Sequence, residues 1–322
     1  MTRSVKDIKH VLTRDLDLDQ SVDIKTLEAH VFSCLGAAQD AMEKEPLSGF
    51  PAFESAHIWN LIGCLSHSHK SIRKLLTGEQ NPSAVDALAI ARLQLESLYT
   101  LCYLLQSPEN VRVFLKNAWK KKYIRFLLHR EEHVNFKRFD KFYSKTGYEL
   151  IEKLQGASSV TAEERRKIEY EQLGYPFGPL PQLTDIPPFP TPGRIISRIA
   201  EPNQRRMLER LYPEYEFLCS FAHGDAESVI FRSLADSRSR FRGMFSTSEM
   251  EYFYQTGVLE PPIVYSVLSA VQVATEIAAR YPANIELYAE AARAWALLSK
   301  WSLIALSVWE IRAKQVLGAI DP

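Results

Sequence analysis

Hydrophobic residues recur along most of the chain at the three- and four-residue spacing of amphipathic helices, and no convincing strand pattern interrupts them. This spacing predicts helices over residues 24–44, 54–77, 83–106, 109–132, 134–154, 161–173, 194–200, 203–222, 225–235, 246–255, 261–281 and 283–317. Several prolines fall near the predicted helix starts, where a missing backbone N–H costs little. The pattern therefore predicts an all-α protein, folded as an irregular multi-helix bundle.

Residues 174–193 interrupt this pattern. They contain seven prolines, so they cannot continue a helix. Their apolar side chains, among them Tyr175, Phe177 and Ile186, are unusual for a flexible linker between two domains. We expect a Pro-rich extended strap, inserted between helices and packed within one domain that spans residues 1–322. Residues 1–22 are expected to form a mobile tail.

A charged pair, Arg92 and Glu96, lies in the segment 87–105, which is otherwise apolar on nearly every side. Such a helix is expected at the centre of the fold, where uncompensated charges are costly and must find partners. Residues four apart share a helical face, which Tyr99 and Tyr103 continue. The pair is either a structural ion pair that fixes helix register, or a site where Arg92 holds an anion and Glu96 orients a base.

A second polar segment runs from Tyr215 to Asp225. Tyr215, Cys219 and His223 share one helical face at four-residue steps. A glycine follows His223 and ends the helix, so the carbonyl end of the helix dipole favours a cationic imidazole there. His223 can act as a general acid or base with Ser220 or Cys219 as a nearby nucleophile. The alternative is that His223 only caps the helix or packs in the core.

Charge is balanced over the 322 residues, with 39 basic and 39 acidic side chains, so no global field attracts nucleic acid or membrane. Residues 112–145 are nevertheless basic, with eleven Lys or Arg against three Asp or Glu, interleaved with aromatic rings. Such a surface can follow a phosphate backbone while rings stack on bases. The alternative is that the rings face the core while Lys120, Lys121 and Lys122 are simply solvated.

The four cysteines, at positions 34, 64, 102 and 219, are scattered in apolar settings without paired spacing. They are expected to be reduced core thiols. The charged N-terminus does not fit a secretory signal, and the late apolar stretch Trp301–Trp309 is too short to cross a bilayer. We therefore expect a cytoplasmic protein without a membrane partner.

Familiar catalytic and metal motifs are missing from the sequence. Glu54-x-x-His57 fits one half of the di-iron pattern of helical bundles, without a second half. His129 and His133 are four apart and could share a metal. No phosphate-cradling glycine loop, nucleophile elbow or dinucleotide fingerprint occurs. The sequence predicts no bound metal and no other cofactor, and it leaves open whether the protein is an enzyme.

Two short motifs carry a resemblance. Arg92-x-x-x-Glu96 is followed by the Tyr-Leu-Leu that begins at Tyr103, and much later comes Tyr215-x-x-x-x-Ser220-x-x-His223. Together they resemble a bacterial family of all-helical proteins classed as a domain of unknown function, over about residues 57–223. The resemblance implies that Arg92, Glu96, Ser220 and His223 gather around one pocket.

That family is loosely similar to the HEPN superfamily, which includes metal-independent ribonuclease toxins and defence effectors. The HEPN signature is arginine, four to six residues and then histidine. The match in this chain is Arg3 to His10, in the predicted tail, which is a poor place for an active site. A HEPN-like reaction would therefore need Arg92 and His223 to act from separate helices.

Two hypotheses follow. In the first, a polar pocket binds an anionic ligand, RNA or a nucleotide, in a defence or toxin-like setting. The predicted catalytic residues are His223, Arg92, Glu96 and Ser220, and the predicted ligand-binding residues are Tyr99, Tyr103, Tyr215 and Cys219. In the second, the polar cluster is structural and the protein is a non-enzymatic scaffold. Its homo-oligomer would form through the C-terminal helices, with Trp295, Trp301 and Trp309 at the interface.

Overall fold

The computed structural model describes residues 23–76, 84–135, 161–179, 183–223, 229 and 260–318. Its longer helices are α2 (Ile24–Lys44), α3 (Ala52–Leu76), α4 (Ala84–Leu104), α5 (Pro108–Asn135), α8 (Ala162–Gln172), α10 (Pro202–His223), α13 (Glu260–Ala278) and α14 (Ile285–Trp301). Shorter elements are the 3₁₀ turn η2 (Leu183–Asp185), α9 (Pro192–Ile196), α15 (Leu303–Val308), the π turn η4 (Trp309–Ala313) and α16 (Lys314–Leu317). No strand occurs in these ranges, so the predicted all-α bundle is confirmed.

Several sequence predictions lie outside these ranges. They are the mobile tail at 1–22 with Arg3 and His10, most of the helices predicted over 134–154 and 225–235, and the helix predicted over 246–255. The side chains of His129 and His133 also lie outside the described part of the chain.

Two compact units make up the chain. One contains residues 1–108 and 191–322, and the other contains residues 109–190. The single domain expected from the sequence stays a prediction.

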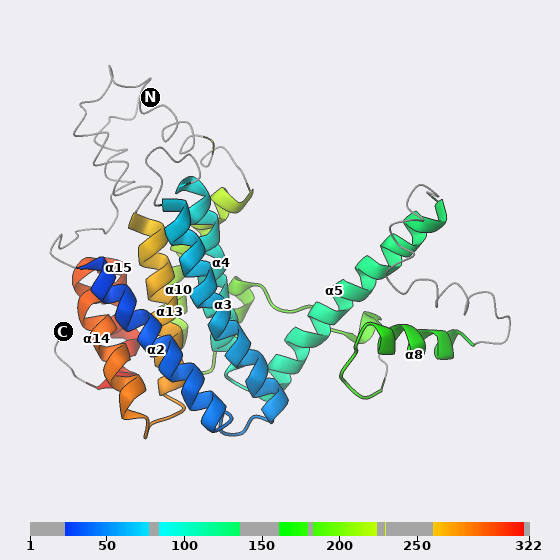
Figure 1. The fold of residues 1–322 in the computed structure, drawn as a ribbon, viewed down its shortest axis with the longest axis horizontal. Coiled ribbons are helices and arrows are strands. Elements are labelled where there is room, and N and C mark those ends of the chain that lie inside the picture. The colour runs from blue at the N-terminus through cyan, green and yellow to red at the C-terminus, as the bar shows by residue number, and fades with distance from the viewer. Residues whose placement is uncertain are drawn as a thin grey trace, which may run out of the picture. The chain divides into compact units, whose positions relative to one another are not determined.

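The central helix of the first unit is α13 (Figure 1). Every side chain from Pro261 to Ala278 is buried, and α13 packs against α2, α3, α4 and α14. A helix that is buried on all sides belongs to the core of a large unit. The two prolines at its start are tolerated because the first turn needs no intrahelical N–H bonds. Most other helices of this unit are arranged around α13.

Helix α4 packs against α3, α10 and α13 with an apolar face that includes Leu88, Leu95 and Leu98, all fully buried. Its opposite edge meets solvent, since Leu93 is 51% exposed. The helix expected at the centre of the fold therefore has one open side. The wholly buried position belongs to α13 instead.

The C-terminal region differs from the single helix predicted over 283–317. Ser302 adopts an extended backbone (φ −142°, ψ 127°), which ends α14 and begins α15, and the π turn η4 follows. Trp295, Trp301 and Trp309 are 0%, 3% and 1% exposed. The predicted interface made by these tryptophans is wrong, because their rings fill the core. Oligomerisation through other C-terminal residues stays a prediction.

The second unit is held by an aromatic cluster. Trp119 of α5 lies with its ring centre 4.2 Å from that of Tyr170 in α8 and 4.8 Å from that of Tyr175 in the Pro-rich segment. Tyr123 and Ile186 complete this core. Edge-on aromatic pairs of this kind add to the stability that burial itself provides. The cluster joins α5, α8 and the Pro-rich segment to one another.

Side chains of α5 also anchor the Pro-rich segment directly. Lys120 Nζ donates to the Ile186 carbonyl at 3.2 Å, and Asn117 Nδ2 donates to the Pro187 carbonyl. Lys122 Nζ donates to the Leu173 carbonyl, next to the end of α8, at 2.7 Å. The segment thus packs on α5 as a strap does. The expectation that Lys120 and Lys122 are simply solvated is wrong, because backbone carbonyls of the neighbouring segments lie within their reach.

The four cysteines differ in how deeply they are buried. Cys34 and Cys102 are buried, Cys219 is partly buried, and all four thiols are free. Cys64 is exposed on α3, so the prediction of a core position is wrong for this residue. Its helical face points away from the buried face that includes Ile62 and Leu65.

Candidate functional site

The predicted charged pair forms a small cluster with a residue of α10. Arg92 Nη1 lies 2.9 Å from Glu96 Oε2, and Arg92 Nη2 donates to the Tyr215 hydroxyl at 2.9 Å. The guanidinium carbon lies 5.3 Å from the centre of the Tyr215 ring, within the range of a cation–π contact. The structure therefore brings Arg92 and Glu96 together with the distant segment predicted to meet them.

Most polar groups of this cluster already interact with one another. The Cys219 side chain interacts with both Arg92 and Tyr215. Burial raises the pKa of Tyr215 to about 12, because its phenolate would lose hydration, so the hydroxyl stays neutral. The buried Nε of Arg92 makes no hydrogen bond to any residue that the structure describes. Glu96, in contrast, is 38% exposed, so the pair lies at the edge of the core.

The two tyrosines that continue this face connect α4 to other segments. Tyr99 is fully buried, and its hydroxyl donates to the Leu208 carbonyl of α10 at 2.8 Å. The Tyr103 hydroxyl accepts from Arg198 Nη1 at 3.4 Å. Burial raises the pKa of Tyr99 far above its ordinary value. Both tyrosines thus tie α4 to neighbouring segments through their hydroxyls.

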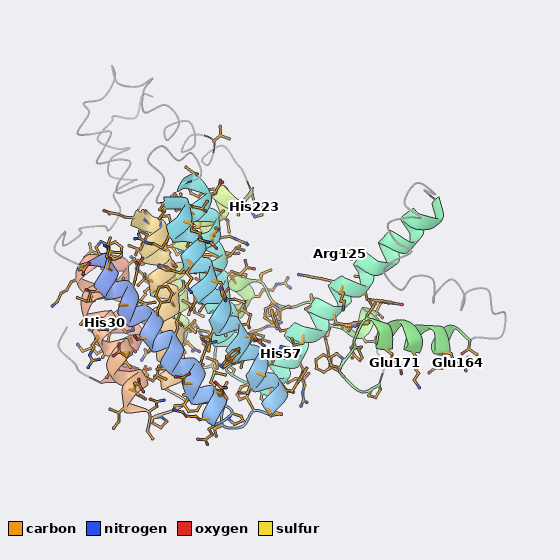
Figure 2. All side chains as sticks on the ribbon, viewed as in Figure 1. His30, His57, Arg125, Glu164, Glu171 and His223 are labelled. Carbon is orange, nitrogen blue, oxygen red and sulfur yellow. The ribbon has the colours of Figure 1, made fainter. Side chains whose placement is uncertain are left out.

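The remaining predicted catalytic residues, Ser220 and His223, make no described hydrogen bond to Arg92. Ser220 donates its hydroxyl to the Phe217 carbonyl at 2.7 Å, inside its own helix. His223 is the exposed last residue of α10 (Figure 2). It is four residues beyond Cys219, which interacts with Arg92, so about one helical turn separates His223 from this cluster. In the described part of the chain, no hydrogen bond or ion pair joins His223 to Arg92, Glu96 or Ser220. The described contacts thus join Arg92 to Glu96 and Tyr215, and the action of His223 and Ser220 with them stays a prediction.

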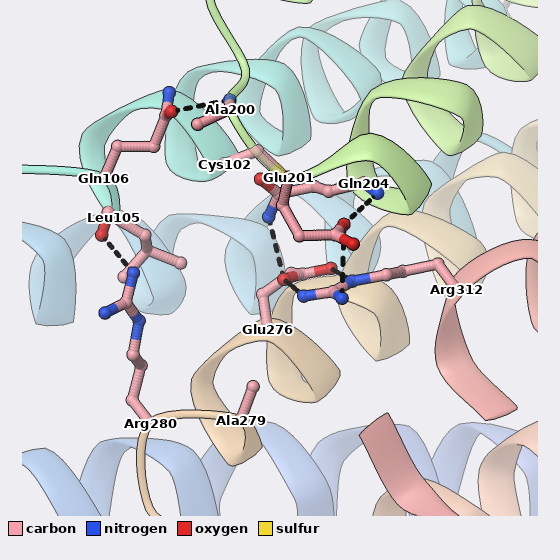
Figure 3. Close-up of a pocket in the computed structure, with 10 residues that line it drawn as sticks. All are labelled: Cys102, Leu105, Gln106, Ala200, Glu201, Gln204, Glu276, Ala279, Arg280 and Arg312. Carbon is pink, nitrogen blue, oxygen red and sulfur yellow. Dashed lines mark hydrogen bonds and ion pairs between the residues drawn. The ribbon is translucent and has the colours of Figure 1, made fainter. Parts of the chain in front are cut away.

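A second polar site lies at the other end of α4, and the sequence did not reveal it. It is a cavity of about 390 Å³, within the size range of small-molecule sites. Its lining residues come from α4, α10, α13, the π turn and the connections between them: Cys102, Leu105, Gln106, Ala200, Glu201, Gln204, Glu276, Ala279, Arg280 and Arg312 (Figure 3).

A buried ion pair forms one wall of this cavity. Arg312 donates from Nε and Nη2 to the two carboxylate oxygens of Glu276, at 2.9 and 2.8 Å. Gln204 and Gln272 each donate one further hydrogen bond to Glu276, at 2.8 and 2.7 Å. Glu276 is 3% exposed and Arg312 is 8% exposed. These two buried charges are tolerated because the Arg312 guanidinium and the side-chain amides of Gln204 and Gln272 donate hydrogen bonds to the Glu276 carboxylate.

Two features of the sequence hint at this pair in hindsight. Glu276 is a lone acid in the buried run of α13, and Arg312 interrupts an apolar C-terminal segment. Their partnership could not be read from spacing, since they are 36 residues apart in different elements. Arg312 lies in the π turn Trp309–Ala313, and π turns are rare but often occur at functional sites.

Some polar groups of the cavity remain open. Arg280 donates from Nη2 to the Leu105 carbonyl at 2.6 Å and makes no other hydrogen bond to a described residue. Gln106 accepts from the Ala200 backbone N–H at 3.1 Å, which leaves its amide NH₂ without a described partner. Across the cavity, Gln204 Oε1 accepts no hydrogen bond from the described residues. Arg280, Gln106 and Gln204 can therefore bind a ligand without losing their present partners.

The described residues contain neither a metal-ligand group nor a membrane-spanning helix. No three of their His, Cys, Asp and Glu side chains are grouped so that they could hold a metal ion. Burial lowers the pKa of His57, the histidine of the half di-iron motif, and its ring packs edge-on against Phe53. Helices long and apolar enough to span a bilayer do not occur in this part of the chain.

No family model, no curated protein and no solved structure matches the chain. The resemblance to an all-helical bacterial family and to HEPN proteins therefore stays a prediction. What the sites can do has to be argued from their geometry.

Proposed function

We propose that the first unit binds a small polar molecule with an acidic group in the cavity beside Glu276 and Arg312. The observation that carries this proposal is Arg280, which lines the cavity with only one described hydrogen bond, to Leu105. A guanidinium has five donors in a planar fork that matches carboxylate and phosphate groups. Arg280 can thus bind an acidic group without breaking the bond that it already makes.

The neighbouring ion pair supports a binding role. Glu276 and Arg312 are buried and hydrogen-bonded on several sides, so this wall of the cavity is held in one arrangement. A preorganised wall lowers the entropy that binding a ligand costs. The π turn that carries Arg312 favours the same conclusion, because such turns concentrate at functional sites.

Arg92 is a weaker candidate for the anion site. Its guanidinium is already engaged by Glu96 and Tyr215, which suits a tether between α4 and α10. An RNA-cleaving role would need His223 to act with Arg92, and they make no described contact. We therefore assign the expected anionic ligand to Arg280 and the structural role to Arg92. A nucleotide remains among the candidate ligands.

Calorimetric titration of the full chain with L-glutamate, succinate and AMP tests the proposal. We expect at least one of these probes to bind, and Arg280→Gln to weaken its binding about tenfold, since a charged hydrogen bond contributes about 1.5–3 kcal/mol. Arg293→Gln is the matched control, because Arg293 is 60% exposed on α14 and lies outside the cavity lining. Melting curves check that both variants fold.

Two results contradict the proposal. One is that neither these three probes nor any standard L-amino acid binds at millimolar concentration. The other is that Arg280→Gln binds the same probe as tightly as the wild type does.

A further inference from the structure

The free hydrogen-bond donors of the described cavity residues lie on one side of the cavity, and the free acceptors lie on the other. Figure 3 shows Arg280 and Gln106 on one side, and Glu201, Gln204 and the Glu276–Arg312 pair on the other. The first side offers donors from the Arg280 guanidinium and the Gln106 amide. We call it the donor end, and we call the side with Glu201 and Gln204 the acceptor end.

The acceptor end carries more negative than positive charge. Arg312 is shared by two carboxylates, since its Nη1 lies 3.3 Å from Glu201 Oε2 while its other nitrogens bind Glu276. Two acids and one base leave an excess of one negative charge. The Glu201 carboxylate also accepts from the backbone N–H groups of Asn203 and Gln204, yet its side chain is 35% exposed. The Glu201 carboxylate can therefore accept a further hydrogen bond from a ligand.

The donor end has the opposite excess. Arg280 is the charged lining residue there, and no ion pair joins it to a described acid. The cavity thus presents a positive group on one side and an unbalanced negative group on the other. A ligand is bound best when its own charges complement both sides.

From this arrangement, and on the basis of the proposed function, we infer that the ligand is a zwitterion of the amino-acid type. Its carboxylate binds Arg280 and the Gln106 amide. Its ammonium group donates to Gln204 Oε1 and to the Glu201 carboxylate. A ligand with a second anionic group in place of the amine would meet the excess negative charge of the acceptor end, so it binds less well.

Calorimetric titration of the full chain with the twenty standard L-amino acids and 5-aminopentanoate tests this inference. The tightest binder is then compared with two analogues, one without its amino group and one without its carboxylate. We expect each analogue to bind at least tenfold more weakly than the parent. An analogue without the amine that binds as tightly as the parent overturns the inference.

Single substitutions at the donor end and the acceptor end test which group of the ligand binds at each. Glu201→Gln should weaken the amino acid about tenfold and leave the analogue without an amine unaffected, whereas Arg280→Gln should weaken both. Glu310→Gln is the matched control, since Glu310 is 53% exposed on the π turn and does not line the cavity. Because Glu201 also caps α10, melting curves accompany the titrations. If Glu201→Gln is destabilised, the comparison of analogues on the wild type still decides the question.

The outcome separates this inference from the function on which it rests. If succinate or AMP binds through Arg280 while no amino acid does, the inference fails and the proposed function stands. If no probe of either panel binds, both fail. Equal binding of the amino acid by Glu201→Gln and wild type also overturns the inference.

Discussion

Glu276 and Arg312 form a two-pronged ion pair between the central helix α13 and the π turn that follows α15, with donor–acceptor distances of 2.9 and 2.8 Å. Both residues are almost fully buried. The pair therefore joins two elements of the core and also forms one wall of the proposed ligand site. A substitution here tests the architecture independently of any ligand.

Arg312→Ala should lower the free energy of unfolding by about 3–5 kcal/mol, because it leaves the Glu276 charge buried without its main partner. The double variant Glu276→Leu with Arg312→Met should regain much of this loss, since it removes both charges. Urea denaturation measures each value. Arg293→Ala, at an exposed ion pair, should cost no more than about 1 kcal/mol. Equal losses for Arg312→Ala and Arg293→Ala would show that the buried pair does not hold the core.

The thiols should differ in reactivity with a disulfide reagent such as DTNB. Cys64 is exposed and should react at once in the folded protein. Burial raises the pKa of the Cys34 and Cys102 thiols, so they stay protonated and should react only after denaturation. Cys64→Ser should abolish the fast phase seen by absorbance. A fast phase that survives this substitution and comes from Cys34 or Cys102 would contradict the packing described.

The contact between α2 and α14 should make stability depend on acid pH. His30 Nδ1 lies 2.9 Å from Glu290 Oε2, and this hydrogen bond lowers the pKa of Glu290 below its ordinary value of 4.5 (His30 in Figure 2). A lowered carboxyl pKa stabilises the fold above that ordinary value, and the stabilisation is lost as the pH falls through the folded-state pKa. Wild type should therefore lose more stability than Glu290→Gln below about pH 4.5.

Urea denaturation at neutral pH and at about pH 3 measures this difference. Glu286→Gln is the control, because Glu286 is exposed in the first turn of the same helix. It should follow the wild-type curve. If Glu290→Gln also follows that curve, the His30 contact does not stabilise the folded state.

Much of the fold was readable from the sequence because helical periodicity is a local signal. The helix predicted over 24–44 is observed over Ile24–Lys44, and the helix predicted over 203–222 is observed over Pro202–His223 despite Pro213 in its interior. The C-terminal helix was predicted too long, since Ser302 adopts an extended backbone and caps α15, and a π turn that contains the buried Trp309 follows. Local spacing carries no information about these two features.

The two polar sites also differ in how much of each could be predicted from the sequence. The four-residue spacing of Arg92 and Glu96 predicted their contact, and the need for a further partner was met by Tyr215. The buried acid lies in α13 and not in the predicted helix, however, because Glu96 reaches solvent while Glu276 does not. The Glu276–Arg312 pair unites two distant segments, so it becomes visible only in the folded chain.

A crystal structure of the full chain, grown with the tightest-binding probe of the titrations, tests the central claim most directly. We predict that the probe lies in the cavity, with its carboxylate or phosphate group hydrogen-bonded to Arg280 and the Glu276–Arg312 pair unchanged. A probe found beside Arg92, or anywhere outside the cavity, would contradict the assignment of the ligand site.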